Sequence, residues 1–301
     1  MDDTETDTPP SRGGFVDLGK DKRPDKQVAH VRAGPENEYP MDYRYMGKAI
    51  IFNIMEFKGS GIKRKDVDAA KLYGKLEDLK FQVSLKNNFS AEEIKDCLAR
   101  VAKENHQDMA CFMCIILTRG REGLILGKDR SIPVEELLQP FKGNKCPSLA
   151  GKPKIFLIQA DQDITFEKES ADFFPLGTKY KPEETKKYRI PAEADFLVAT
   201  SVIPGKWSWD ITLPTASHFK KYKNASCFIH HLCEMLEKES EQEEESERLD
   251  LLTLFMRVSQ LATCDVQQAL GDTHKALFEE YDLIPCVTST LTKDIIFPIS
   301  D

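Results

Sequence analysis

The sequence lacks an apolar run long enough to cross a membrane. Its longest run covers residues 109–117, whereas a membrane-spanning helix needs about 20 apolar residues. The chain begins Met1-Asp2-Asp3, without the basic residues and the apolar stretch of a secretory signal. We therefore expect a cytoplasmic protein that does not contact a membrane.

Excess positive charge is also missing. The chain has 42 basic and 50 acidic residues, which gives a net charge of −8. This balance argues against nucleic-acid binding, because such binding depends on neutralising phosphates. Much of the negative charge lies in residues 237–250, a run that is typical of a solvent-exposed segment.

The eight cysteines do not form the pattern of a disulfide framework. They are scattered and mostly lie within apolar runs, which indicates reduced thiols in the core. Cys111 and Cys114 form a Cys-x-x-Cys pair within an expected strand, where this spacing points the two side chains to opposite faces. With no second pair, a zinc or redox role for this motif is not favoured.

A second group of possible metal ligands lies in an expected helix. Its members are Cys227, His230, His231 and Cys233, and their spacing could bring two or three of them to one face. Apolar residues crowd the same helix: Phe228, Ile229, Leu232 and Leu236. Packing is therefore favoured over metal binding, and we expect neither a metal nor another cofactor.

Expected strands alternate with expected helices along the chain. The strand patterns cover residues 49–52, 81–85, 109–117, 154–161, 190–200 and 284–291. Helical patterns begin at Asp66 and after Ser90, and continue at 134–138, 218–237 and 249–264. This order predicts an α/β fold with a mostly parallel sheet and helices on both faces. Residues 159–161 would then lie at the carboxyl end of a strand, where such sheets bind their ligands.

Two segments interrupt this pattern. Residues 1–36 are polar and charged, and contain too few large apolar residues to fold alone. Residues 162–189 form a long stretch of mixed charge with two prolines and a glycine. Loops of this length are uncommon in a compact domain unless they are functional or disordered.

A family resemblance follows from the strand end at residues 159–161. Gln-Ala-Cys followed by Arg, Gln or Gly is the nucleophile signature of caspases, and here the sequence is Gln159-Ala160-Asp161-Gln162. Further matching stretches cover residues 41–52, 66–69, 112–115, 151–154, 190–196 and 284–286. The chain resembles caspases over residues 40–299, and is most similar to effector caspases and to the decoy caspases of insects.

The resemblance implies a six-stranded caspase-type sheet and a division of the chain. Residues 1–36 would be a short disordered prodomain, 37–161 a large-subunit region, 162–189 a linker and 190–301 a small-subunit region. It also implies that two units pair through the last strand, in which the interface residues would be Cys286, Val287, Thr288, Ser289, Thr290 and Leu291.

The same resemblance places unexpected residues at the catalytic positions. The family's nucleophilic cysteine falls on Asp161 and its histidine falls on Arg119. A carboxylate is a poor attacker of an amide, and arginine does not exchange its proton. We therefore expect a chain that is not an enzyme. Asp161 and Arg119 could form a salt bridge, and the alternative is two solvated side chains.

The substrate pocket is also altered. The resemblance assigns it to Arg64, Gly120, Gln159, Trp207, Trp209 and Asp210. Asp210 stands where the family has a second arginine, and it would repel an acidic substrate. Gly120 matches the family's oxyanion-hole glycine. The two tryptophans could line an apolar groove or pack within their turn.

These positions predict a protein that regulates apoptosis by binding. The expected partner is an active caspase, whose activity would rise on dimerisation, or a second copy of this chain. An inhibitory decoy and a sink for caspase inhibitors are alternatives. An enzyme of altered chemistry that uses Asp161 is a further alternative.

Overall fold

A computed structural model of the protein describes residues 36–59, 63–64, 66, 68–121, 123–162, 194–204, 226–242, 248–270 and 285–298. Among the helices described there, none combines the length and the apolar character that crossing a membrane requires.

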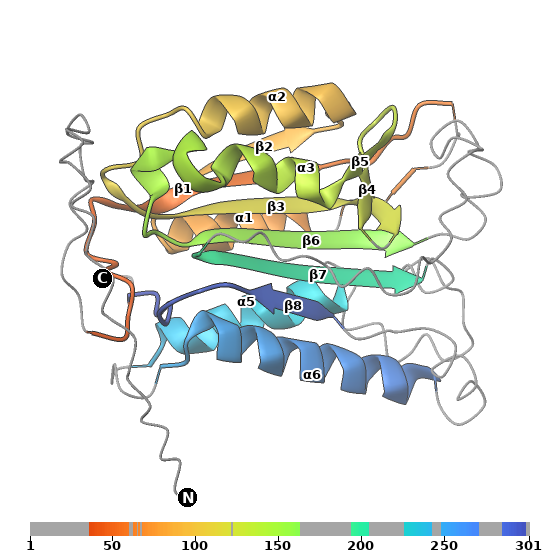
Figure 1. Cartoon of the computed structure of the whole chain (residues 1–301). Helices are drawn as coiled ribbons and strands as arrows, with labels where there is room; N and C mark the ends of the chain where they lie inside the picture. Colours follow the sequence, from red (N-terminus) through yellow and green to blue (C-terminus); the bar gives the residue numbers. More distant parts are fainter. Residues whose placement is uncertain are drawn as a thin grey trace, which may run out of the picture.

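One sheet runs through the middle of the molecule (Figure 1). Its main strands are β1 (Tyr45–Asn53), β2 (Phe81–Asn87), β3 (Met109–Arg121), β6 (Lys154–Gln162), β7 (Phe196–Pro204) and β8 (Cys286–Ser289), in the order β2-β1-β3-β6-β7-β8. All neighbouring pairs are parallel except β7 and β8. The six-stranded, mostly parallel sheet expected from the sequence is therefore confirmed. Two short strands, β4 (Leu124–Leu126) and β5 (Ser131–Pro133), extend it beside β3.

Helices cover both faces of the sheet (Figure 1). One face carries α2 (Ala91–Val101) and α3 (Val134–Leu138), and three short 3-10 turns follow α3 at Gln139–Phe141, Gly143–Lys145 and Pro147–Leu149. The other face carries α1 (Ala69–Asp78), α5 (Cys227–Ser240) and α6 (Leu251–Leu270). The helix α2 begins after Ser90 as predicted, with a capping box in which the Ser90 hydroxyl accepts the Glu93 amide and the Glu93 carboxylate accepts the Ser90 amide.

The two faces of the sheet have separate apolar cores. In β3, Met113 and Ile115 belong to the core under α1, α5 and α6, whereas Phe112 and Cys114 belong to the core under α2 and α3. Both faces of β3 are thus buried, which explains why its sequence is continuously apolar. Cys111 lies in the first core and Cys114 in the second, so this pair does point to opposite faces.

The start of α1 differs from the expectation. The helix begins at Ala69, not directly after Asp66, and its buried residues are Ala69, Leu72 and Leu76. The Asp66 carboxylate accepts the Asn53 side-chain amide at 2.8 Å and the Ala69 backbone amide at 3.2 Å. Asp66 therefore ties the end of β1 to the turn before the helix.

Several strands also have different bounds from those predicted: β1 and β2 are longer than expected, and β8 is shorter. The strand β3 continues to Arg121 because Gly120 and Arg121 pair with β4. The strand β7 begins at Phe196 and not at residue 190. Residues 1–35 and 163–193 lie outside the described residues, and they include nearly all of the expected prodomain (1–36) and of the expected linker (162–189).

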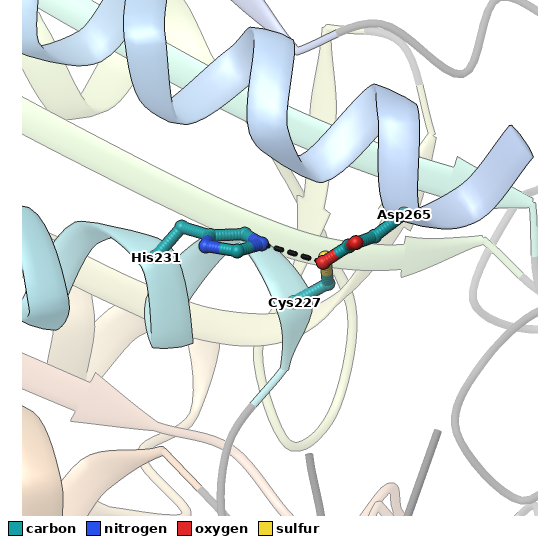
Figure 2. A group of neighbouring side chains, drawn as sticks. All are labelled: Cys227, His231 and Asp265. Carbon is teal, nitrogen blue, oxygen red and sulfur yellow. Dashed lines mark hydrogen bonds and ion pairs between the residues drawn. The ribbon is translucent and has the colours of Figure 1, made fainter. Parts of the chain in front are cut away.

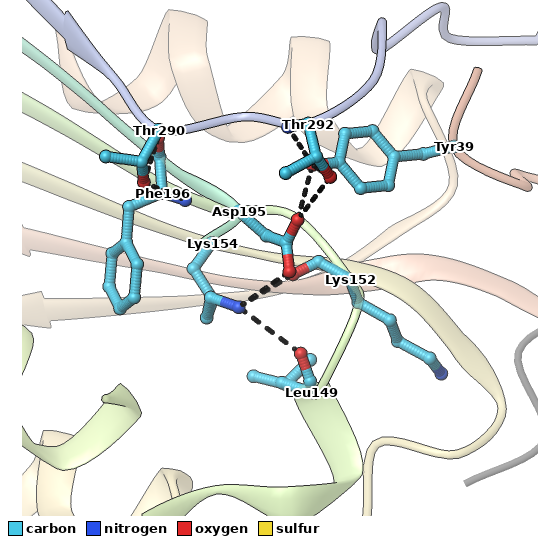
Figure 3. A network of polar contacts seen from close by, with 8 residues as sticks. All are labelled: Tyr39, Leu149, Lys152, Lys154, Asp195, Phe196, Thr290 and Thr292. Atoms are coloured by element: carbon cyan, nitrogen blue, oxygen red, sulfur yellow. Dashed lines mark hydrogen bonds and ion pairs between the residues drawn. The ribbon is translucent and has the colours of Figure 1, made fainter. Parts of the chain in front are cut away.

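Two buried lysines at the start of β6, Lys152 and Lys154, connect it to the starts of β3 and β7 (Figure 3). The Lys152 ammonium donates to the backbone carbonyls of His106, Gln107 and Met109 at 2.9, 3.0 and 2.6 Å. The Lys154 ammonium donates to the Lys152 carbonyl at 3.0 Å and lies 3.9 Å from the Asp195 carboxylate. Each buried charge is therefore satisfied by backbone oxygens or by an opposite charge.

Asp195 links this lysine pair to the end of the chain (Figure 3). Its carboxylate accepts hydrogen bonds from the Tyr39 hydroxyl at 2.7 Å and the Thr292 hydroxyl at 2.9 Å. Its backbone amide donates to the Thr290 carbonyl at 2.9 Å. Asp195 thus fixes the residues that follow β8 against the start of β7.

Tyr39 makes the stability of this junction sensitive to alkaline pH. Burial, with the Asp195 carboxylate adding to it, raises the pKa of Tyr39 from 10 to about 12. The folded state therefore favours the neutral phenol, so its contribution is complete below pH 10 and is lost as the pH rises from 10 to 12. Melting temperatures measured between pH 9 and 12 should fall less for Tyr39→Phe than for the unmodified chain. Parallel curves for the two proteins would contradict this assignment.

Candidate functional site

Several predicted site residues are neighbours across the carboxyl ends of β3, β6 and β7. Gln159 pairs with Leu117 on one side and Ser201 on the other. Two residues further on, Asp161 pairs with Arg119. The backbone of Arg119 and that of Asp161 are therefore direct neighbours, as expected for residues at adjacent strand ends.

Arg119 is a buried cation at this edge. Its side chain is only 7% exposed, and its guanidinium carbon lies 6.0 Å from the centre of the Phe57 ring. A buried charge is costly unless it is compensated by an opposite charge, hydrogen bonds or an aromatic face. The strand position beside Arg119 carries the carboxylic residue Asp161. The salt bridge between them stays a prediction that the strand register supports.

Arg64 is buried near the carboxyl end of β1. Its guanidinium donates to the Asn53 side-chain oxygen and, at 3.2 Å, to the Ile54 carbonyl. Asn53 is the last residue of β1 and pairs with Leu117 of β3. Arg64 is therefore anchored to the same edge of the sheet as Arg119, and its assignment to the substrate pocket stays a prediction.

Gln159 and Ser201 are neighbouring polar side chains that lie buried in the sheet. Each is 1% exposed, and they face each other across β6 and β7. The Gln159 amide nitrogen and oxygen and the Ser201 hydroxyl have no hydrogen-bond partner among the described residues. Buried polar atoms without partners are rare in folded proteins, and they mark a place that could receive a polar group.

Gly120 is fixed by the close approach of β4. A Cβ atom at this position would lie 2.4 Å from the Leu124 carbonyl oxygen and 3.2 Å from the Ala160 Cβ. Thr118, two residues earlier, donates its hydroxyl to the Leu126 carbonyl at 2.6 Å. Packing alone therefore requires glycine at residue 120, whatever part its backbone plays in binding.

Trp207, Trp209 and Asp210 lie outside the described residues. Their assignment to the substrate pocket stays a prediction.

One cluster of reactive side chains combines two predicted candidates with a residue that sequence analysis missed. Cys227 and His231 on α5 meet Asp265 on α6, and their donor atoms lie within 4.8 Å of one another (Figure 2). Cys233 packs in the core as predicted, and His230 lies 3.2 Å from the Glu234 carboxylate. Asp265 was missed because it is 34 residues from His231, and only the pairing of α5 with α6 brings it near.

Most of the other described thiols are made unreactive by burial. Burial raises the pKa of Cys111, Cys114 and Cys146, and it raises that of Cys233 to about 11. A thiol that stays protonated at neutral pH is a weak nucleophile. These four cysteines are therefore core residues.

Comparisons with known proteins point to one family. A family model described as the caspase domain matches residues 46–296. Caspase-7 of Gallus gallus is 33% identical over 311 residues, which cover 99% of this chain and 94% of the relative. Caspase-3 of Bos taurus is 34% identical over 270 residues, covering 87% and 88%. A solved structure titled pro-sf-caspase-1 is 32% identical, with a TM-score of 0.66, and covers 89% of this chain and 98% of that one.

Gly120→Ala tests how tightly this edge is packed. The added methyl group would collide with the Leu124 backbone, so we expect a loss of about 1–3 kcal/mol in the free energy of unfolding. Gly74→Ala is the matched control, because Gly74 lies in α1 with no atom within 4 Å of its Cβ position. Alanine there should stabilise by roughly 0.5–1 kcal/mol. Equal effects in urea unfolding would contradict the packing argument.

A double-mutant cycle tests the predicted salt bridge. Arg119→Gln and Asp161→Asn should each destabilise the chain, and together they should cost less than the sum, with a coupling of at least about 1 kcal/mol. The control cycle uses the exposed pair Arg130 and Glu92, whose charges lie 2.6 Å apart and should couple by less than about 1 kcal/mol. If the changes in the free energy of unfolding caused by the two substitutions are additive in urea unfolding, the salt bridge between Arg119 and Asp161 is contradicted.

The prediction that the chain is not an enzyme is wrong. It rested on the residues at positions 119 and 161, but the relatives that cover most of the chain are caspases, which are cysteine proteases. Assignment of Arg119 and Asp161 to the family's catalytic positions stays a prediction. From the match over residues 46–296 and these relatives, the chain belongs to the caspase family.

Proposed function

We propose that this caspase-family chain regulates apoptosis by pairing with an active caspase through the edge of its sheet at β8, and that pairing raises the partner's activity. The observation that carries this proposal is the outer side of β8. Among the described residues, β8 pairs with β7 alone. No described residue pairs with its other side, which could therefore accept a strand from another chain.

Along β8 and the following Thr290, the backbone N–H and C=O groups point alternately toward β7 and away from it. The Thr290 amide donates to the Phe196 carbonyl at 2.8 Å, and the Thr290 carbonyl accepts the Asp195 amide. Backbone groups in an antiparallel strand alternate between its sides, so those of Ser289 and Val287 face outward. Outward amides and carbonyls on an edge strand are a template for pairing with another strand.

The side chains of this edge also suit an interface. Cys286 is exposed, and the residues from Val287 to Leu291 are partly buried in the single chain. A hollow next to the strand is lined by Ser289, Leu291, Thr292 and Asp250 among others. A strand of four residues offers few hydrogen bonds, so contacts in this hollow would have to add to the interface.

Rigid support of the edge favours activation of the partner. Thr290 and Thr292 are held by Phe196 and Asp195 before any partner arrives (Figure 3). A preorganised edge loses little conformational entropy on binding. More of the binding free energy is therefore available to stabilise an ordered conformation of the partner's own chain.

Titration of an active caspase with this chain tests the proposal. Peptide turnover by a caspase from the same source should rise and then saturate as the purified full-length chain is added. Because the family is one of peptidases, turnover by the chain alone must be measured at each concentration and subtracted. A fall in turnover would contradict activation and support an inhibitory decoy, and no change would contradict regulation of that caspase.

Two arginine substitutions place the effect on one edge. Cys286→Arg adds bulk and charge at an exposed position of β8, and Gln82→Arg does the same at an exposed position of β2, the opposite edge. Cys286→Arg should raise the concentration of this chain that gives half of the maximal increase in caspase turnover by at least about tenfold. This is equivalent to about 1.4 kcal/mol of pairing free energy. Gln82→Arg should leave it unchanged. Equal effects of the two variants would contradict pairing through β8.

Capture of a caspase inhibitor is a second candidate function. It is favoured by the buried Gln159 amide and Ser201 hydroxyl, which have no hydrogen-bond partner among the described residues. A polar inhibitor group at the carboxyl edge of the sheet could satisfy them. Binding of a fluorescent aspartyl-peptide inhibitor that weakens in Gln159→Leu would support this function, and failure to bind would exclude it for that inhibitor class.

A further inference from the structure

Three side chains from two helices converge on the face of the sheet that carries α5 and α6 (Figure 2). Cys227 is the first residue of α5, and His231 follows four residues later on the same face of that helix. Asp265 approaches from α6, with its carboxylate oxygen 2.7 Å from the His231 Nε2 and 4.0 Å from the Cys227 Sγ.

We propose that Cys227, His231 and Asp265 bind a zinc ion. A thiol, an imidazole and a carboxylate are all zinc ligands in proteins. Their donor atoms already lie within 4.8 Å of one another. Cys227 and His231 are buried, and Asp265 is partly exposed. An ion could therefore enter from the Asp265 side, where a water molecule would complete a four-coordinate site.

The orientation of the imidazole argues for a metal site over a nucleophile activated by a base. An activated thiol needs its sulfur at one ring nitrogen and an orienting carboxylate at the other. Here the Asp265 oxygen contacts Nε2, and the Cys227 sulfur lies beside that same oxygen. Figure 2 shows the sulfur and the carboxylate on one side of the ring. The three donors thus face a common point.

Only small movements separate this arrangement from tetrahedral coordination. With metal–ligand distances of about 2.0–2.3 Å, neighbouring ligand atoms in a tetrahedral zinc site lie roughly 3.3–3.6 Å apart. The carboxylate oxygen is 2.7 Å from the ring nitrogen and 4.0 Å from the sulfur. The sulfur and the imidazole nitrogen lie within 4.8 Å of each other, so shifts of about 1 Å, within the reach of side-chain rotation, would bring the three distances toward that range.

Charge and ligand type favour zinc over calcium or magnesium. A cysteine thiolate and an aspartate carboxylate together neutralise a divalent cation, so the filled site would bury no net charge. Sulfur and imidazole ligands suit zinc, whereas calcium and magnesium prefer oxygen. Binding would release the thiol proton to solvent, because the thiolate is the ligand.

A second carboxylate is placed to orient the histidine. Glu234 lies one helical turn beyond His231, with an oxygen 3.4 Å from the His231 Nδ1. Its other oxygen lies 3.2 Å from the His230 Nε2. Zinc-binding histidines commonly donate their second ring N–H to such a carboxylate, which fixes the tautomer. His231 would then bind zinc through Nε2.

The proposed ion would connect the two longest helices on this face. The helices α5 and α6 pack against each other through Phe228 and Phe255, whose rings stack at 6.3 Å. Zinc held by Cys227 and His231 on α5 and Asp265 on α6 would add a link near the start of α5 and the second half of α6. Removal of the ion should therefore loosen this helix pair.

Zinc binding by the full-length chain tests the proposal. The zinc affinity is measured in competition with a chromophoric zinc chelator, and a phosphine reductant keeps the thiols reduced. We expect one zinc ion per chain. Cobalt bound in its place should give a thiolate-to-cobalt charge-transfer band. Cys227→Ala and His231→Gln should each weaken zinc binding by at least about 100-fold, and Glu234→Gln by about tenfold, as for groups that contact the ion directly and indirectly.

Matched controls come from the same helix. Cys233→Ala and His230→Gln remove the same residue types from positions outside the cluster, and both should retain the zinc affinity and the cobalt band. Circular dichroism must confirm that each variant is folded, and Asp265→Asn, on the partly exposed side, replaces Cys227→Ala if that variant does not fold. Absence of zinc binding at micromolar concentrations, or equal losses in cluster and control variants, would overturn the proposal.

Discussion

The parallel register of β3 and β6 decides what the carboxyl edge of the sheet presents. Gln159 falls beside Leu117, and Asp161 beside Arg119. A shift of one residue would move every side chain of the strand to the opposite face, so this edge depends on the apolar residues that fix the register. These include Ile115, whose neighbours in β1 and β6 are buried as well. Packing in the middle of the sheet therefore sets the chemistry at its end.

The opposite end of β6 and β7 is held by polar contacts. The buried Lys152 and Lys154 ammonium groups donate hydrogen bonds to backbone carbonyls in place of water, and Lys154 also forms an ion pair with Asp195. The same aspartate fixes Tyr39 and Thr292, so it joins the start and end of the described chain to the sheet. The edge strand β8 is thereby supported from within the molecule. The proposed pairing through its outer side would therefore not require a partner to order it first.

Much of the fold follows from local patterns in the sequence. The apolar run at residues 109–117 predicts a buried strand, and the helical pattern after Ser90 predicts a helix start; both are present. The end of β3 could not be predicted, because Arg121 joins the strand through pairing with β4. Asp265 could not be recognised for the same reason, since helix pairing brings it to His231. The residues at positions 119 and 161 suggested an inactive chain, whereas similarity over the whole chain identifies a peptidase family.

If this chain regulates an active caspase through β8, the two proteins must form a complex. Native mass spectrometry of the two purified proteins, mixed at equal micromolar concentrations, measures that complex without reference to turnover. Pairing through β8 predicts a species that contains one copy of each chain and that is lost in the Cys286→Arg variant. Spectra that contain only the separate proteins and their own dimers would contradict it.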